Sequence, residues 1–275
     1  MQQSIKTVKV REIEIGGPKF TLIAGPCMFE SMELCRTVAG HMQDVCNRLG
    51  INYIFKASFD KANRTSSDSF RGIGVEEGMT SIAAIKKEFD LPATTDVHEV
   101  CQVGEVADVV DLLQIPAFLC RQTDLLKACA LTGLPVNIKK GQFLAPWDTK
   151  NIVRKMEAFG CEQVLLTERG TSFGYNTLVV DMSGLPIMRS YGYPIVFDAT
   201  HSVQQPGGAG TASGGNREAI PYLARAAMAV GIDAMFMEVH PEPEKGLSDS
   251  ASMFPLAEVE PLLKQLLAIR SVIQI

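Results

Sequence analysis

Residues 53–65 read YIFKASFDKANRT, an apolar run that passes directly into a polar loop. The cations Lys56, Lys61 and Arg64 fall within nine residues of this segment. A buried ammonium group is costly unless a partner neutralises it. A solvated surface turn would also accommodate these charges. The apolar strand directly before them nevertheless favours an anionic ligand with a phosphate group.

The same pattern recurs along the chain. Short apolar runs end in polar residues, and each is followed by a longer amphipathic segment, which is typical of a parallel sheet with crossover helices. Glycines at positions 50, 133, 160 and 231 stand where such helices should end. The predicted strands are residues 20–24, 53–57, 93–97, 109–115, 135–139, 163–167, 194–198 and 234–238, and the predicted helices include 31–49, 78–88, 123–132, 149–159 and 217–230.

Eight strands joined by helices in a chain of 275 residues predict an α/β fold, a (β/α)8 TIM barrel that forms a single domain over residues 1–275. A doubly wound open sheet is the alternative, but no glycine-rich dinucleotide-binding motif follows the first predicted strand. Residues 8–16 alternate apolar and charged side chains, and Gly16-Gly17-Pro18 then turns the chain. This predicts a short N-terminal β-hairpin that plugs or flanks the barrel.

The composition narrows the class of function. The formal net charge is −5, so nucleic acid is not an expected partner, because backbone phosphates require a net basic surface. The first residues lack the apolar core of a signal peptide, and charges such as Arg225 and Asp233 interrupt later apolar runs. We therefore expect a cytoplasmic protein without a membrane partner.

A closed barrel would bring the carboxyl ends of all eight strands to one face. Each predicted strand ends in residues with chemical function, so these side chains should form one site and indicate an enzyme. In strand order they are Cys27; Lys56, Lys61 and Arg64; Asp96 and His98; Gln114; Lys139 and Lys140; Glu168 and Arg169; Asp198 and His201; and Glu238 and His240.

Four of these cations, Lys56, Lys61, Lys139 and Arg169, would face the same barrel mouth. Together they suit a small ligand that carries both a phosphate and a carboxylate, because arginine offers a two-pronged donor and each lysine a point charge. The alternative is that each cation forms a structural ion pair.

Cys27, His201 and Glu238 follow strands one, seven and eight, which are neighbours in a closed barrel. Asp249 lies in the loop after the eighth strand and can reach the same point. A thiolate, an imidazole and carboxylates suit a divalent transition metal (Zn²⁺, Mn²⁺, Fe²⁺ or Co²⁺) and fit Mg²⁺ or Ca²⁺ poorly. The alternative is that Cys27 is a small core residue and His201 a hydrogen-bonding one.

Residues 204–216 read QQPGGAGTASGGN and follow His201 closely. So long and glycine-rich a loop after a barrel strand predicts a lid that closes on the ligand and excludes water. A plain flexible connection is the alternative. A phosphate-binding P-loop does not fit, because the Gly-Lys-Ser/Thr ending is missing.

Nine segments form a specific sequence pattern because of their lengths and their order along the chain. They are IAGPC (23–27), FKASFDKANR (55–64), TDVH (95–98), LQIPAF (113–118), CRQTD (120–124), NIKKGQFL (137–144), ERGTSFGY (168–175), FDATHSVQ (197–204) and EVHPEP (238–243). With them the chain resembles, over nearly its whole length, the 3-deoxy-D-manno-octulosonate 8-phosphate synthases, also called 2-dehydro-3-deoxyphosphooctonate aldolases.

The resemblance implies a transferase of a homotetrameric family. Its reaction condenses phosphoenolpyruvate with D-arabinose 5-phosphate and water, giving 3-deoxy-D-manno-octulosonate 8-phosphate and phosphate, a committed step toward lipopolysaccharide. By motif, the phosphoenolpyruvate pocket would be lined by Lys56, Lys61, Asp96, Gln114, Lys139 and Arg169. The arabinose phosphate would be held by Asn63, Arg64 and Thr65, with Arg121 from a neighbouring subunit. The catalytic set would be Lys139, Asn63, Asp249 and His201, and the metal ligands Cys27, His201, Glu238 and Asp249.

Two departures qualify the resemblance, and Cys27 indicates which branch of the family it points to. Thr65 stands where the family usually has Ser, which keeps the hydroxyl. Ser250-Ala251 follows Asp249 where Gly-Pro or Gly-Ala is expected, so Asp249 is the ligand whose placement is in question. Cys27 stands where members that work without metal carry Asn, and the resemblance is therefore to the metal-requiring branch.

Other activities stay open. The sister reaction, 3-deoxy-D-arabino-heptulosonate 7-phosphate synthesis from erythrose 4-phosphate, usually goes with Lys-Pro-Arg-Thr where this chain reads Lys61-Ala-Asn63-Arg64. This difference favours the five-carbon acceptor. A metal-dependent hydrolase on a barrel would leave the four cations unexplained, and a non-catalytic sugar-phosphate-binding barrel would need no metal.

Overall fold

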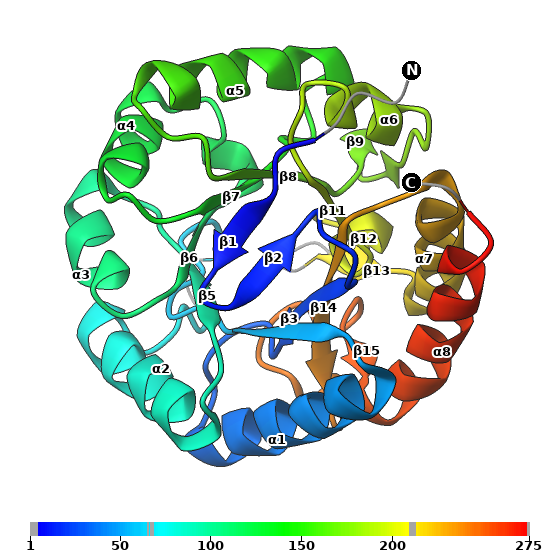
Figure 1. Ribbon diagram of the computed structural model, residues 1–275. Coiled ribbons are helices and arrows are strands. Elements are labelled where there is room, and N and C mark those ends of the chain that lie inside the picture. The colour runs from blue at the N-terminus through cyan, green and yellow to red at the C-terminus, as the bar shows by residue number, and fades with distance from the viewer. Residues whose placement is uncertain (1–4, 65, 67–68, 209–212, 274–275) are drawn as a thin grey trace.

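The computed structural model describes residues 5–64, 66, 69–208 and 213–273. In this part of the chain eight parallel strands form a closed barrel (Figure 1), because β14 pairs both with β3 and with β11. The (β/α)8 prediction is confirmed, and the open sheet is excluded. The barrel strands are β3 (Thr21–Gly25), β4 (Asn52–Lys56), β5 (Ala93–Asp96), β6 (Leu112–Ile115), β7 (Val136–Lys139), β8 (Val164–Glu168), β11 (Ile195–Asp198) and β14 (Ala234–His240).

Helices surround the barrel as an outer ring (Figure 1). The first begins after Ser31, whose hydroxyl accepts a hydrogen bond from the Leu34 backbone N–H at 3.1 Å, and ends at Gly50, where φ is 67°. The helices are α1 (Met32–Leu49), α2 (Val75–Phe89), α3 (Val103–Ala107), α4 (Thr123–Leu131), α5 (Thr149–Ala158), α6 (Gly184–Arg189), α7 (Ile220–Val230) and α8 (Val259–Arg270).

The strand predicted over residues 109–115 is too long. Val109 and Val110 both donate backbone hydrogen bonds to the Val106 carbonyl, so they belong to the last turn after α3. The strand β6 therefore begins only at Leu112. An apolar sequence alone does not separate a buried helix end from the strand that follows it.

The predicted N-terminal hairpin is present as β1 (Val8–Val10) and β2 (Ile13–Ile15), and Figure 1 shows it across the centre of the barrel. Its strands are joined at Arg11, where φ is 50°, and not at Gly16-Gly17-Pro18, which leads on to β3. Its buried apolar side chains pack against the inward-facing residues of the barrel. The hairpin thus plugs the end of the barrel at which the strands begin.

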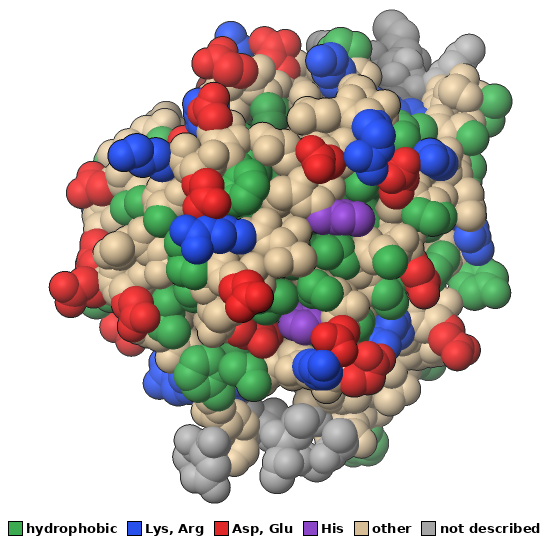
Figure 2. All heavy atoms as spheres, turned by 90° about the horizontal axis from the view of Figure 1, so that it is seen from below, with side chains coloured by type: hydrophobic (Ala, Val, Ile, Leu, Met, Phe, Trp, Pro, Cys, Tyr) green, Lys and Arg blue, Asp and Glu red, His purple; other side chains and the backbone are tan. Residues whose placement is uncertain are grey.

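Short strand pairs decorate the loops. They are β9 (Thr171–Ser172) with β10 (Leu178–Val179) and β12 (Gln204–Gln205) with β13 (Gly214–Gly215), while β15 (Phe254–Pro255) extends the sheet beside β14. Acidic and basic side chains are interspersed over the face in Figure 2. In the described ranges, no helix combines the length and apolar character needed to span a membrane.

Candidate active site

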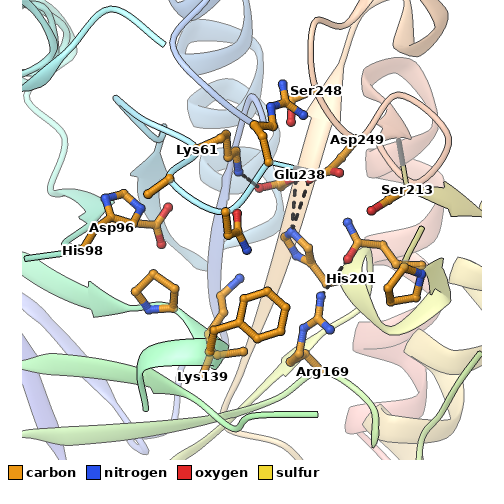
Figure 3. Close-up of a pocket in the computed structure, with 18 of the residues that line it drawn as sticks. Lys61, Asp96, His98, Lys139, Arg169, His201, Ser213, Glu238, Ser248 and Asp249 are labelled. Carbon is orange, nitrogen blue, oxygen red and sulfur yellow. Dashed lines mark hydrogen bonds and ion pairs between the residues drawn. The ribbon is translucent and has the colours of Figure 1, made fainter. Parts of the chain in front are cut away.

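A cavity of about 520 Å³ opens at the carboxyl ends of the barrel strands. Seven of the eight strands supply its polar lining, as predicted from the strand ends (Figure 3). In strand order these residues are Lys56 with Lys61, Asn63 and Arg64; Asp96; Gln114; Lys139; Arg169; His201; and Glu238 with Asp249.

Lys56 is fully buried at the base of the site. Its Nζ lies 2.5 Å from Glu238 Oε1 and 2.7 Å from the Cys27 carbonyl oxygen. The backbones of β3 and β4 also approach closely at this point, which requires Gly25, because a Cβ there would lie 1.8 Å from the Lys56 carbonyl oxygen. Lys61 shares the same Glu238 oxygen at 3.4 Å. The protein itself therefore neutralises Lys56, whose charge was expected to require a ligand.

Glu238 is ionised despite its burial. Burial alone would raise its pKa, but the ammonium groups of Lys56 and Lys61 hold the pKa of Glu238 well below its usual range. One carboxylate thus faces two lysines on one side of the cavity.

Lys139 lies above the ring of Phe236, with Nζ 3.5 Å from the ring centroid and 2.7 Å from Asp198 Oδ2. Burial lowers the pKa of Lys139, and the Asp198 carboxylate offsets part of this effect. A lysine with a lowered pKa that faces a cavity is suited to giving up a proton.

Arg169 projects into the cavity from the end of β8. Its Nη2 donates to Gln204 Oε1 at 2.7 Å, whereas its buried Nη1 has no hydrogen-bond partner among the residues that the structure describes. A buried guanidinium nitrogen without a partner is costly. An anion in the cavity would supply the missing acceptor.

The predicted metal ligands lie close together. Cys27 Sγ and carboxylate oxygens of Glu238 and Asp249 all lie within 4.8 Å of one another, and Sγ is 3.5 Å from Asp249 Oδ2. His201 Nε2 lies 3.5 Å from Glu238 Oε2 and 4.0 Å from Asp249 Oδ2 (Figure 3). One sulfur, one imidazole nitrogen and two carboxylates fit a divalent transition metal.

Asp198 orients the His201 ring. Asp198 Oδ2 lies 2.7 Å from His201 Nδ1. Burial alone would raise the pKa of Asp198, but His201 and Lys139 hold this pKa low. An ionised carboxylate accepts a hydrogen bond from Nδ1–H, which leaves the lone pair of Nε2 facing Glu238 and Asp249. Burial raises the pKa of the Cys27 thiol well above its usual value, and Glu238 adds to this.

Ser250-Ala251 does not remove Asp249 from this cluster. The Asp249 carbonyl accepts backbone hydrogen bonds from Ser252 at 2.9 Å and Met253 at 3.1 Å, which closes a tight turn. Asp249 itself takes a left-handed conformation with φ of 47°, which aspartate tolerates better than most residues. The turn keeps its carboxylate beside Cys27.

Comparison with known proteins identifies the family. The family model described as the DAHP synthetase I family matches residues 3–274. The chain is 59% identical over 268 residues to the 2-dehydro-3-deoxyphosphooctonate aldolase of Cyanothece sp., covering 97% of this chain and 98% of that protein. It is 57% identical to the protein of that name from Fusobacterium nucleatum, over 98% of both chains.

The chain belongs to the 2-dehydro-3-deoxyphosphooctonate aldolase family. The resemblance seen in the sequence is thereby confirmed. The sister heptulosonate synthesis is not favoured, because these relatives all carry the octonate name, as does one from Trichlorobacter lovleyi at 54% identity over 98% of this chain and 99% of that protein.

The residues assigned to the acceptor lie in two places. Asn63 and Arg64 line the cavity, and Arg64 donates to the Phe70 carbonyl at 3.0 Å and to the Leu247 carbonyl at 2.9 Å. Thr65 falls outside the described residues. Arg121 is exposed and lines a separate cavity of about 240 Å³ beside α5. Its predicted role requires a second subunit and stays a prediction.

The expectation that every polar strand end faces the site is wrong for Lys140, Glu168 and His240. Lys140 is buried outside the cavity, where it donates to Thr171 Oγ1 at 2.9 Å and lies 3.5 Å from Glu168 Oε1. The Glu168 carboxylate accepts a hydrogen bond from the backbone N–H of Arg169, and His240 Nδ1 accepts one from the backbone N–H of Glu242. Successive strand residues point to opposite faces, so Lys140 and Glu168, the neighbours of Lys139 and Arg169, face away. His240 shares the face of Glu238 but lies two residues further along β14 and does not line the cavity.

Three residues of the site were given no role from the sequence. Gln204 holds Arg169, Gln142 lines the cavity with a buried Oε1 that lacks a partner among the described residues, and Ser58 donates to Asp96. Gln204 also begins the glycine-rich segment, whose ends pair as β12 and β13 while residues 209–212 fall outside the described part. Gln142 follows β7, Gln204 follows β11 and Ser58 follows β4. These positions beyond the carboxyl ends of strands were the sequence signal that could have placed the three residues in the site.

Proposed function

We propose that the protein condenses phosphoenolpyruvate with D-arabinose 5-phosphate and water, giving 3-deoxy-D-manno-octulosonate 8-phosphate and phosphate. One observation carries the proposal. Four cationic side chains converge on one cavity, three of them buried, and a buried donor of Arg169 has no partner among the residues that the structure describes, in a chain closely related to proteins named for this product.

Phosphoenolpyruvate would occupy the cavity between Lys61, Lys139 and Arg169. Arg169 Nη1 and the Lys61 ammonium would supply charge-assisted donors for its carboxylate and phosphate. Lys56, Gln114 and Asp96 would line the base of this pocket. Because the groups are already positioned and largely desolvated, they can hold the negative charge that the reaction develops.

The acceptor would bind at the outer part of the cavity. Asn63, Arg64 and Thr65 would hold arabinose 5-phosphate, and Arg121 of a neighbouring subunit would complete the phosphate site in a homotetramer. Arg121 lies outside the active-site cavity of its own subunit, which agrees with a role in another subunit. The reaction would take place in the cytoplasm.

Carbon 3 of phosphoenolpyruvate would attack the acceptor aldehyde while water adds to carbon 2. Phosphate then leaves by cleavage of the carbon–oxygen bond. Lys139 and Asn63 would polarise the aldehyde oxygen, and the lowered pKa of Lys139 suits it to protonate the alkoxide that forms. His201 and Asp249 complete the proposed catalytic set.

Cys27, His201, Glu238 and Asp249 would hold Zn²⁺, Mn²⁺, Fe²⁺ or Co²⁺. Such an ion, when bound, orients substrates or lowers the pKa of a water molecule. The donor chemistry of the cluster supports this part of the proposal.

The test is phosphate release from phosphoenolpyruvate in the purified protein. We expect release that depends on added arabinose 5-phosphate. Release with erythrose 4-phosphate alone would indicate the sister reaction. No release with either aldose, in protein supplied with each of the four metals, would contradict the proposal and favour a binding module.

A further inference from the structure

A chain of hydrogen bonds runs beneath the cavity across consecutive barrel strands. The Thr167 hydroxyl donates to Asn137 Oδ1 at 2.6 Å, and the Asn137 amide donates to Gln114 Oε1 at 3.0 Å. The Gln114 amide donates to Asp96 Oδ1 at 2.6 Å, and the Ser58 hydroxyl donates to the other oxygen of Asp96. These five residues, the polar belt, are all buried.

The polar belt has a single direction. An ionised carboxylate only accepts hydrogen bonds, so Gln114 must turn its N–H toward Asp96 and its oxygen toward Asn137. Asn137 must then turn its N–H toward Gln114, which leaves its oxygen for a donor. Thr167 is that donor. The Asp96 carboxylate thus sets the direction, and the Thr167 hydroxyl supplies the last donor that this direction requires, which completes the hydrogen bonds of both amides.

The two ends of the polar belt lie in different surroundings. Asp96 and Gln114 line the cavity, whereas Thr167 and Asn137 are fully buried below it. Although burial alone would raise the pKa of Asp96, nearby Lys56 and other cations keep it low. The belt thus links a residue without access to the cavity to an anion within it.

We propose that Thr167 is a positioning residue for phosphoenolpyruvate, because its hydroxyl completes the polar belt and so holds Gln114 and Asp96 in the orientation in which they face the substrate pocket. The inference rests on the proposed function. Without the Thr167 hydroxyl, Asn137 Oδ1 would be buried without a donor, which is costly. Turning over both amides to relieve it would aim the Gln114 oxygen at the Asp96 carboxylate. Either response disturbs the phosphoenolpyruvate side of the cavity.

The chain offers a matched control on β5. Thr95 is adjacent to Asp96 and fully buried, but its hydroxyl has no hydrogen-bond partner within the described ranges. Thr167→Val and Thr95→Val therefore make the same chemical change at two buried positions. Only the first removes a donor from the polar belt.

The experiment measures steady-state rates with both substrates, and phosphoenolpyruvate binding by calorimetry without the acceptor, in wild type, T167V, T167S and T95V. We expect T167V to raise both KM and Kd for phosphoenolpyruvate about tenfold, the effect of one buried hydrogen bond, while KM for arabinose 5-phosphate stays near wild type. T167S, which restores the hydroxyl, should return both constants toward wild type, and T95V should match wild type.

Wild-type constants for phosphoenolpyruvate in T167V, with only a lower Tm, would make Thr167 a structural residue and overturn the proposal. Equal rises in KM for both substrates would overturn it too. If T167V does not fold, T167C, with similar volume and a weaker donor, decides by the same criterion. A wild type that binds phosphoenolpyruvate but does not turn over refutes the proposed function instead, and the calorimetric Kd values still decide the role of Thr167.

Discussion

The interior of the barrel differs sharply between its two ends. Near the strand beginnings the inward-facing side chains are apolar and pack against the hairpin β1–β2. Two residues further along, the same strands carry polar groups: Ile54 is followed by Lys56 on β4, and Val196 by Asp198 on β11. One end resembles an ordinary core. The other holds charges that an apolar core would exclude.

The charged end folds because its groups neutralise one another. Lys56 pairs with Glu238, and Lys139 with Asp198. Such pairs are weak sources of stability, because desolvation offsets much of their attraction. The comparison therefore assigns stability mainly to the apolar end and ligand binding to the charged end. Each end can be altered separately.

The largest effect is expected from metal removal at the charged end. Exhaustive treatment with EDTA should abolish activity, and Mn²⁺, Zn²⁺, Fe²⁺ or Co²⁺ should restore it to different extents, because we propose that Cys27, His201, Glu238 and Asp249 hold such an ion. The assay is arabinose-dependent phosphate release. Full activity after metal removal would make Cys27 only a core thiol.

Cys27→Asn sharpens this test. An amide binds these ions more weakly than a thiolate, and the other ligands remain as hydrogen-bonding groups. Since Asp249 keeps its place beside Cys27, we expect a poor enzyme that EDTA no longer inhibits. Bound metal, measured by elemental analysis, should fall in parallel.

Lys139→Met should lower kcat about 10²- to 10³-fold, because it removes a preorganised cation from the reacting atoms. Asp198 keeps His201 as a partner, so circular dichroism should still show a folded barrel. Lys127→Met, on an exposed position of α4, is the control and should retain wild-type kcat. A normal kcat in Lys139→Met would remove this residue from the catalytic set.

Leu165→Ala alters the apolar end. It should lower the free energy of unfolding by about 2–5 kcal/mol, the usual result of emptying a buried leucine site, because Leu165 is fully buried against the hairpin cluster. Urea titration measures the loss, and kcat of the folded fraction should stay near wild type. Leu131→Ala, at a site 68% exposed, should change little. A large fall in kcat would show that the two ends are not separable.

Arg64→Ala should have a smaller and more selective effect. Loss of a charge-assisted contact of about 1.5–3 kcal/mol should raise KM for arabinose 5-phosphate far more than KM for phosphoenolpyruvate. Arg121→Ala should behave alike if Arg121 serves a neighbouring subunit, and a change that breaks the proposed tetramer should mimic it. Equal rises for both substrates would contradict the assignment.

The sequence predicted the barrel and most of the site because both follow from periodicity. Once eight strands alternate with helices, their ends must converge, so Cys27 and Glu238 meet although 211 positions separate their residue numbers. The direction of individual side chains was less predictable. Lys139 and Lys140 read alike, but strand alternation turns only Lys139 into the cavity. The partnership of Gln204 with Arg169 depends on loop packing, which the sequence pattern does not encode.

Oxygen-18 water tests most directly whether the charged end carries out the proposed condensation. If water adds to carbon 2 of phosphoenolpyruvate and phosphate leaves by carbon–oxygen cleavage, mass spectrometry should find the label in the eight-carbon sugar acid phosphate and not in the released phosphate. Label in the inorganic phosphate would mean attack at phosphorus and would contradict the mechanism.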